Sequence, residues 1–452
     1  MKKKVYILGG GFGGLYTALE LERRLRRESD IDITLVSRDN FFLFTPMLHE
    51  VAASDLELTT IVNPMRKLLS KVQLFAGEVE HIDLPNSRLT LAHGFKRHSH
   101  TVPYDQLILA LGSVANFHNL PGLAERAITM KSLGDAVALR NRLIAHLEEA
   151  DTDCAKWERE PLLTFVVAGG GFAGVETIAA INDLLRQALP LYRNLSEKML
   201  RLVLVHPGMF LLPELGEELG KYTQAKLEKR GIQIVLNTRV AAVSDDSVSL
   251  TNGVVIRSST IIWTAGITPN PLLEALPCSK DHGQVVVNDY LQITDFPNVW
   301  AVGDCAAIID RRTGRPYPPT AQHALRQGRV AAHNLIAAIR GRSAKRFSFR
   351  TLGQMAAIGQ RAGVADVLGV KFSGFPAWWL WRTIYLSKLP GWDRKVRVAL
   401  QWTLDVIFSK DVTQYLTVRA PTMSQDETIA VETHLRNQQV AGSIPAGGSR
   451  KS

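Results

Sequence analysis

A glycine-rich turn constrains this chain more than any other feature, because it fixes a strand, a turn and a helix in one order. Gly9, Gly11 and Gly14 have the spacing G-x-G-x-x-G. The apolar residues 5–8 before them suit a buried parallel strand, and residues 31–36 supply a second strand after the predicted helix. The first glycine permits the tight turn, the second lets a pyrophosphate approach the backbone, and the third lets helix and strand pack closely. The pattern predicts a dinucleotide-binding unit.

The same pattern occurs a second time. Gly169, Gly171 and Gly174 again follow an apolar strand and precede a helix, and residues 202–205 supply the next strand. One such turn can arise for steric reasons alone, whereas two in matching contexts indicate two bound dinucleotides. Two dinucleotide carriers in one chain indicate electron transfer between them. We therefore expect an α/β fold with two Rossmann-like domains.

Later segments fit the same scheme. Residues 107–112 (LILALG) and 261–266 (IIWTAG) are apolar strands that end in a small residue and glycine, so each can close a sheet while a cofactor passes nearby. Gly303 and Asp304 end another strand, in VWAVGDCA. A carboxylate there can accept hydrogen bonds from the ribityl hydroxyls of a flavin. These segments favour FAD as one of the two dinucleotides.

From about Lys4 to Tyr415 the sequence resembles the two-dinucleotide-binding flavoproteins, and within them the type II NADH:quinone oxidoreductases. A related prenylquinone-reductase branch is also similar, especially in WRTIYLSKLP from Trp381. Four segments carry the resemblance: FLFTPMLHEVA from Phe42, GGGFAGVE from Gly169, IIWTAGITPN from Ile261 and PPTAQHALRQG from Pro318.

The resemblance implies a discontinuous FAD domain with a nicotinamide domain inserted in it, and a C-terminal region for membrane association or dimer contacts. It also implies the residues that contact each cofactor, with Pro46 near the isoalloxazine ring. The implied domains are 1–115 and 285–345 for FAD, 116–284 for NAD(P)H, 346–420 for the C-terminal region, and 421–452 as a disordered tail. The implied FAD contacts are Gly9, Gly11, Gly14, the backbone of Val79, Ala110, Gly112, Gly303 and Asp304, and the implied nicotinamide contacts are Gly169, Gly171, Gly174 and Gly266.

The sequence departs from the family pattern where an acidic residue usually binds each adenosine ribose. In the FAD domain Ser37 and Arg38 stand there; they can bind a hydroxyl and the adenine or a phosphate, or they can simply begin a loop. In the nicotinamide domain His206 takes the place of the carboxylate that favours NADH. No arginine lies next to it, although a protonated imidazole could hold a 2′-phosphate. We expect NADH as the substrate, with NADPH as an alternative.

Glu176 and Gln322 are the candidates for catalysis. Reducing a quinone to a quinol requires protons, and the resemblance places Glu176 near the flavin in the proton relay and Gln322 at the quinone head-group. From the residues alone, Glu176 can instead be a first-turn helix residue favoured by the helix dipole, and Gln322 can be a helix cap. Both interpretations stay open at the level of sequence.

The cysteines and histidines define the alternatives. Cys154, Cys278 and Cys305 are the only cysteines; their spacing leaves a sulfide:quinone reductase possible, but no redox cysteine pair follows either glycine pattern. A nucleotide-sensing flavoprotein of the apoptosis-inducing-factor type is a second alternative. The histidines at 93, 98 and 100 lie in a polar stretch without carboxylates or cysteines, so we expect a solvated hairpin loop and no metal.

The C-terminal region favours a membrane. Five of the eight tryptophans lie between Trp378 and Trp402, among basic residues, and an apolar face recurs at helical spacing from Val396. The net charge of +10 suits an anionic surface, and no basic run is long enough for a nucleic-acid arm. The same helix could instead pack on the enzyme's own core or on a dimer partner. With the resemblance, we expect a homodimer bound peripherally to the cytoplasmic side of a membrane, a prenylquinone as electron acceptor, and neither a transmembrane helix nor proton pumping.

Overall fold

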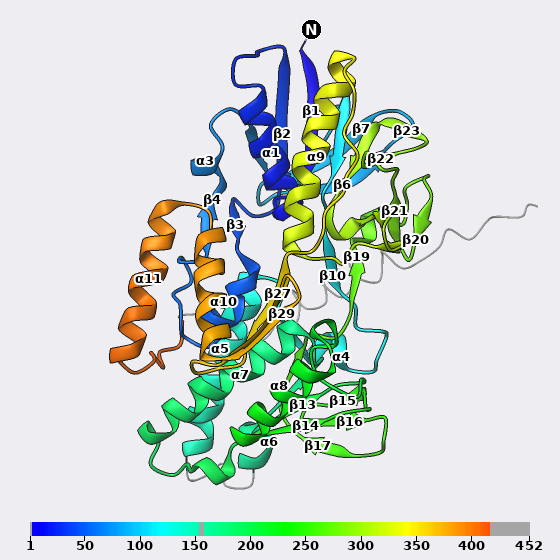
Figure 1. Ribbon diagram of the computed structural model, residues 1–452. Helices are drawn as coiled ribbons and strands as arrows, with labels where there is room; N and C mark the ends of the chain where they lie inside the picture. The colour runs from blue at the N-terminus through cyan, green and yellow to red at the C-terminus, as the bar shows by residue number, and fades with distance from the viewer. Residues whose placement is uncertain (1, 153–157, 416–452) are drawn as a thin grey trace, which may run out of the picture. The chain divides into compact units, whose positions relative to one another are not determined.

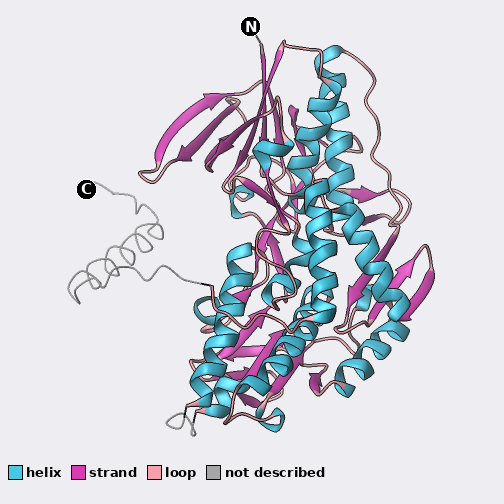
Figure 2. Cartoon of the chain, turned by 90° about the vertical axis from the view of Figure 1, so that its left-hand side faces the viewer, coloured by secondary structure: helices cyan, strands magenta, loops and turns pink. Residues whose placement is uncertain are grey.

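The computed structural model describes residues 2–152 and 158–415 (Figure 1). Cys154 and the predicted tail, 421–452, lie outside the described residues. Helices and strands, drawn in cyan and magenta in Figure 2, build two largely parallel sheets with helices packed on them. The predicted α/β class is therefore confirmed.

The first sheet begins with β1 (Lys3–Leu8), which continues through the glycine turn into α1 (Phe12–Arg24). Val5, Ile7 and Leu8 are fully buried, which explains the apolar run. Strand β23 (Phe296–Ala301), which follows the whole second sheet in sequence, pairs in parallel with β9 (Gln106–Leu109). Helix α9 (Ala321–Arg340) packs against α1 (Figure 1). The sheet order is β22 (Gln292–Ile293), β23 (Phe296–Ala301), β9 (Gln106–Leu109), β1, β2 (Ile31–Ser37) and β5 (Gln73–Ala76).

The second sheet repeats this plan. Its central strand β12 (Thr164–Ala168) is buried along its whole length and leads through the second glycine turn into α7 (Phe172–Ala188). Helix α5 (Leu133–Asp151) begins with a capping box in which Ser132 and Asp135 bind each other's backbone N–H groups. The parallel order is β11 (Ile128–Thr129), β18 (Thr260–Trp263), β12, β13 (Arg201–Val205) and β14 (Ile232–Val235).

Smaller antiparallel sheets accompany the two main ones. Strands β6 (Glu78–Asp83), β7 (Arg88–His93) and β8 (His98–Pro103) form one of them. His93 pairs with His98 in its register, and Phe75 packs against His93 and His100. The three histidines are thus strand residues and not loop residues, which corrects that expectation.

The C-terminal region is a three-stranded sheet followed by two helices. The strands are β27 (Gly353–Ala357), β28 (Gly363–Val367) and β29 (Val370–Gly374), and the helices are α10 (Phe375–Lys388) and α11 (Trp392–Ile407), drawn in orange in Figure 1. Within the described ranges, no helix is both long enough and apolar enough to cross a bilayer.

Candidate functional site

The first glycine turn has the shape that a pyrophosphate requires. Gly9 has φ +110° and donates its N–H to the Val36 carbonyl at 2.8 Å. A Cβ on Gly14 would lie 1.8 Å from the Gly9 oxygen, so only glycine allows the helix to start this close to the strand. A Cβ on Gly11 would meet nothing within 4 Å, which leaves that side of the turn open. The turn therefore fits the phosphates of a dinucleotide.

The second turn reproduces this geometry. Gly169 has φ +114° and donates its N–H to the Val205 carbonyl at 2.9 Å. A Cβ on Gly174 would lie 1.8 Å from the Gly169 oxygen, and the space around Gly171 is open. Two turns of the same shape, each at the carboxyl end of a parallel strand, can hold two dinucleotides.

The remaining predicted FAD contacts lie on several elements around the first turn. The carbonyl of Ala110 comes so close to Gly9 that a Cβ there would lie 2.2 Å away. Gly112 has φ +69° and open space around it, and Gly303 donates its N–H to the Gln327 side chain at 2.9 Å. Ser113 donates its hydroxyl to Asp304 at 2.7 Å, which fixes that carboxylate beside the exit of β9.

Four further predicted FAD contacts lie at the end of β2, in the loop after it, on β6 and in a short 3₁₀ turn. Ser37, at the end of β2, directs its hydroxyl at the turn, where a Cβ on Gly10 would lie 2.5 Å from it. Arg38 is exposed. Val79 is half-buried on β6, and Pro46 is half-buried in a short turn of 3₁₀ helix just before α2 (Leu48–Ala52).

His206 is held in an uncharged state. Its Nδ1 accepts the N–H of Gly170 at 3.0 Å, so this nitrogen carries no proton. Burial lowers the pKa of the imidazole, although a hydrogen bond to the Phe210 backbone opposes the shift. The protonated imidazole considered for a 2′-phosphate is therefore disfavoured. Gly266 lies against His118, whose Nε2 would be 2.6 Å from an added Cβ, and no pattern in the sequence indicates this neighbour.

Glu176 is a buried carboxyl group on α7, next to the second turn. It is the fifth residue of the helix, so the first-turn alternative is wrong. Its Oε1 accepts the backbone N–H of Ala357 at 3.1 Å and the indole N–H of Trp381 at 3.0 Å. Its Oε2 lies 3.7 Å from Nδ1 of His49. Burial raises the pKa of Glu176 to about 8, against the two hydrogen bonds, so the group is mainly protonated at neutral pH.

Gln322 links α9 to β27, the strand that also contains Ala357. Its amide nitrogen donates to the Gly353 carbonyl at 3.1 Å, and the cap position of α9 is Thr320, so the capping alternative is also wrong. Gly353 begins β27 and Ala357 ends it. The anchoring points of Gln322 and Glu176 are thus roughly 13 Å apart along one strand. Both side chains therefore bind the backbone of β27, Gln322 at its start and Glu176 at its end.

Two buried residues beside Glu176 were assigned no role from the sequence. His49 and Glu50 lie on α2, and all five residues of that helix are buried. Glu50 accepts the indole N–H of Trp402 at 3.1 Å. Neither residue belongs to a glycine pattern. The only sequence signal in this region is the segment FLFTPMLHEVA, which carries part of the family resemblance.

The described cysteines are unsuited to thiol chemistry. Cys305 is fully buried with its sulfur 3.2 Å from the Val302 carbonyl, and burial raises the pKa of its thiol to about 11. Burial also raises the pKa of the Cys278 thiol. A thiol with a raised pKa holds little thiolate at neutral pH, which argues against the sulfide:quinone alternative.

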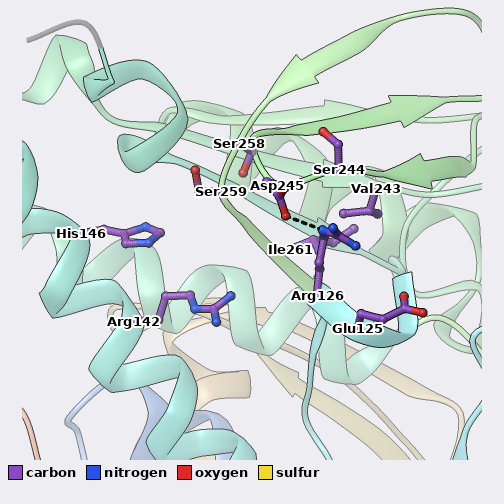
Figure 3. A pocket seen from close by; sticks show the side chains of 10 residues that line it. All are labelled: Glu125, Arg126, Arg142, His146, Val243, Ser244, Asp245, Ser258, Ser259 and Ile261. Atoms are coloured by element: carbon purple, nitrogen blue, oxygen red, sulfur yellow. Dashed lines mark hydrogen bonds and ion pairs between the residues drawn. The ribbon is translucent and has the colours of Figure 1, made fainter. Parts of the chain in front are cut away.

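A polar cavity of about 320 Å³ lies beside the second sheet, lined by residues between 125 and 261 (Figure 3). Ser258 and Ser259 line it just before β18, at the edge of the sheet opposite Gly169. Its Arg126 is paired with Asp245 at 2.8 Å, as the dashed line in Figure 3 shows. The cavity is therefore separate from the nucleotide turn.

Known proteins match nearly the whole chain. The family model "Pyridine nucleotide-disulphide oxidoreductase" matches residues 3–328, and the model "NDH2 C-terminal domain" matches residues 352–411. The chain is 33% identical to the type II NADH:quinone oxidoreductase Ndh of Mycobacterium tuberculosis, over 90% of this chain and 89% of the relative. It is 32% identical to the demethylphylloquinone reductase NdbB of Synechocystis sp., over 89% and 96%. Among solved structures, NDH2 of Plasmodium falciparum in complex with NADH has the same fold, with a TM-score of 0.85 at 19% identity over 91% of this chain and 100% of that one.

Proposed function

The chain belongs to the type II NADH:quinone oxidoreductase family, and we propose that Glu176 and Gln322 form the quinone end of its active site. As a member of this family it is an FAD-dependent NADH dehydrogenase that reduces a quinone to a quinol. Bound FAD supplies the two-electron exchange between nicotinamide and quinone. The observation that carries the assignment is the pair of glycine turns with matching geometry, with a buried carboxyl group shortly after the second.

The two turns divide the cofactors between them. Residues 1–115 and 285–345 would hold FAD, with the pyrophosphate at Gly11 and the ribityl chain at Asp304. Residues 116–284 would hold NADH at Gly171. The open space at each of these glycines and the hydrogen bond that fixes Asp304 support this division.

Glu176 would deliver a proton to the quinone, because a buried carboxyl group with a pKa near 8 still carries its proton at neutral pH. Gln322 would orient the head-group. His206 would favour NADH, since an uncharged imidazole gives no attraction to a 2′-phosphate.

A peripheral attachment to a membrane surface would bring the enzyme to its lipid-soluble quinone. Helix α11 and the residue after it expose large apolar side chains, and Trp392 at its start is 79% exposed. Lys395 and Arg397 lie on the same helix, which suits anionic headgroups. The cytoplasmic face, a homodimer and a prenylquinone acceptor complete the proposal. The exposed apolar side chains are Trp392, Val396, Leu400, Leu404, Ile407 and Phe408.

Anaerobic stopped-flow spectroscopy tests the reaction directly. Purified protein is mixed with NADH or NADPH, and the bleaching of flavin absorbance is followed; a soluble quinone is then added. We expect fast bleaching by NADH and fast recovery with quinone. Slow bleaching would favour a nucleotide-sensing flavoprotein, and a reduced flavin that ignores quinone would refute the proposed acceptor.

Vesicle flotation tests the attachment. We expect the protein to float with vesicles that contain anionic lipid, and the double variant Leu400→Ser/Leu404→Ser to stay in the soluble fraction while NADH still bleaches its flavin. Leu352→Ser, at another exposed apolar position, is the matched control. Flotation of the double variant at the level of the unaltered protein would contradict this surface.

A further inference from the structure

A second carboxyl group is buried close to Glu176. Glu50 on α2 is 6% exposed, and its Oε2 accepts the Trp402 indole N–H at 3.1 Å. No lysine or arginine nitrogen of the described chain lies within ion-pair distance of it, namely 4.0 Å. Burying a carboxyl group without an ion-pair partner is costly, and neither the nucleotide turns nor the proposed roles of Glu176 and Gln322 require Glu50.

Glu50 and Glu176 form a matched pair. Each accepts one indole N–H from the C-terminal helices, Glu176 from Trp381 on α10 and Glu50 from Trp402 on α11. The two indole rings have centroids 6.4 Å apart, and His49 packs on Trp381 with its Nδ1 3.7 Å from Glu176. The pKa of each carboxyl group is raised to about 8, mainly by burial, and the charge of Glu50 contributes to the rise at Glu176. The two groups are therefore close enough to influence each other's protonation.

The surroundings of the two groups differ in charge. Arg382 and Lys410 face Glu50 and lower its pKa against burial, while Asp55 raises it. No cation contributes to the pKa of Glu176, which only hydrogen bonds lower. Burial lowers the pKa of His49 to about 3, so the imidazole adds no positive charge. With these contributions included, both carboxyl groups have a pKa of about 8, so neither binds the proton much more tightly and a proton can pass between them.

Glu50 has a partly exposed carboxylate as its neighbour, because the backbone N–H of Asp55 donates to the Glu50 carbonyl at 2.7 Å. Lys410 binds Asp55 at 2.7 Å, and the Asp55 side chain is 20% exposed. Asp405 on α11 is half-buried, and burial raises its pKa to about 6. Asp55, Glu50 and Glu176 are thus neighbouring carboxyl groups, two of them buried and one partly exposed, and together they can connect solvent to Glu176.

Reduction of the quinone needs a supply of protons from solvent. In NADH + H⁺ + quinone → NAD⁺ + quinol, the hydride brings two electrons and one proton, and the other proton comes from solvent. We propose that Glu50 passes this solvent proton to Glu176 after each turnover, so that the two carboxyl groups act in series. The inference rests on the proposed role of Glu176 as the proton donor to the quinone. The O–H bond of Glu50 breaks, an O–H bond forms on Glu176, and Glu50 is reprotonated from the side of Asp55.

The variant Glu50→Gln tests the relay. Glutamine keeps the volume and still accepts the Trp402 N–H, but it cannot release and recover a proton. We expect bleaching of the flavin by NADH to be unchanged and its recovery with quinone to slow by about 10²-fold. Glu57→Gln, at an exposed position of the same segment, is the matched control and should behave as the unaltered protein.

Two further readouts separate a relay from a packing role. In Glu50→Ala, added formate should restore quinone-driven recovery in proportion to its protonated form, because a small acid can replace the missing proton source. The infrared carbonyl band of protonated carboxyl groups at pH 7 should lose intensity in Glu50→Gln relative to Glu57→Gln. A slowed Glu50→Ala that formate does not rescue would assign Glu50 to packing and overturn the relay.

Glu176→Gln, measured beside Glu50→Gln, separates the relay through Glu50 from the proposed role of Glu176. If Glu176→Gln blocks quinone-driven recovery and Glu50→Gln recovers at the unaltered rate, the relay is wrong and the proposed role of Glu176 stands. If Glu176→Gln itself recovers at the unaltered rate, the proposed role of Glu176 fails, and the relay fails with it.

Discussion

The buried carboxyl group of Glu176 should make the stability of the fold depend on pH. Its pKa is 4.5 in an unfolded chain and about 8 in the fold, so the folded state binds the proton more tightly. The free energy of unfolding therefore falls as pH rises from about 4.5 to about 8, and changes little from this group outside that window. At 1.36 kcal/mol per pKa unit, the change would reach about 5 kcal/mol.

The variant Glu176→Gln removes this dependence. Glutamine stays neutral, and its side-chain oxygen can still accept the N–H groups of Ala357 and Trp381. Water entry and relaxation around a buried charge reduce the full penalty, so we expect the variant to gain on the order of 2 kcal/mol over the unaltered protein at pH 8.5. At pH 5 the two should be equally stable.

Urea unfolding followed by tryptophan fluorescence, with FAD in excess at both pH values, measures the difference. Glu57→Gln serves as the control for removing one carboxyl group. Parallel stability profiles of Glu176→Gln and the unaltered protein between pH 5 and 8.5 would refute the reasoning, because they would mean that Glu176 ionises in the fold as readily as in the unfolded chain.

Other substitutions test the cofactor sites. Gly14→Ala places a methyl group against the Gly9 oxygen and should yield protein without FAD, seen as loss of the flavin absorbance. Gly174→Ala makes the same clash in the second turn and should retain FAD but bleach at least about tenfold more slowly with NADH, by stopped flow. His206→Arg should raise the NADPH-to-NADH ratio of bleaching rates by about tenfold, because it adds a cation where the neutral imidazole now lies; an unchanged ratio would place the 2′-hydroxyl elsewhere.

The glycine turns could be predicted from the sequence because every contact that defines them is local or lies between neighbouring strands. Gly14 must approach Gly9, five residues earlier, and the spacing itself carries that information. The apolar runs before both turns likewise indicate strands buried on both faces. The same reasoning placed Asp304 at the end of a strand, and it lies at the exit of β23.

The partners of Glu176 could not be predicted in this way. Trp381 is 205 residues away along the chain, and Glu50 is 352 residues from its Trp402. No periodicity encodes which tryptophan meets which carboxyl group, because that depends on how the C-terminal sheet and helices pack on α2 and α7. For the same reason the sequence left Glu176 as a possible first-turn residue, favoured in its charged form, whereas burial favours the protonated form.

Helix α11 shows what periodicity does and does not determine. The spacing of apolar residues from Val396 indicates an amphipathic helix, but it cannot say which side faces inward. The structure buries Val398 and Trp402 and exposes Leu400 and Leu404, so the side that carries Trp402 to Glu50 is opposite the apolar side that the sequence singled out. One helix thus contributes a hydrogen bond to the proton-binding pair and offers its other face to a surface outside the fold. If that surface is the membrane, one helix of sixteen residues determines both the attachment of the protein to the membrane and the orientation of the Glu50 side chain. Vesicle binding should then alter the quinone-driven step and leave flavin reduction by NADH as it is.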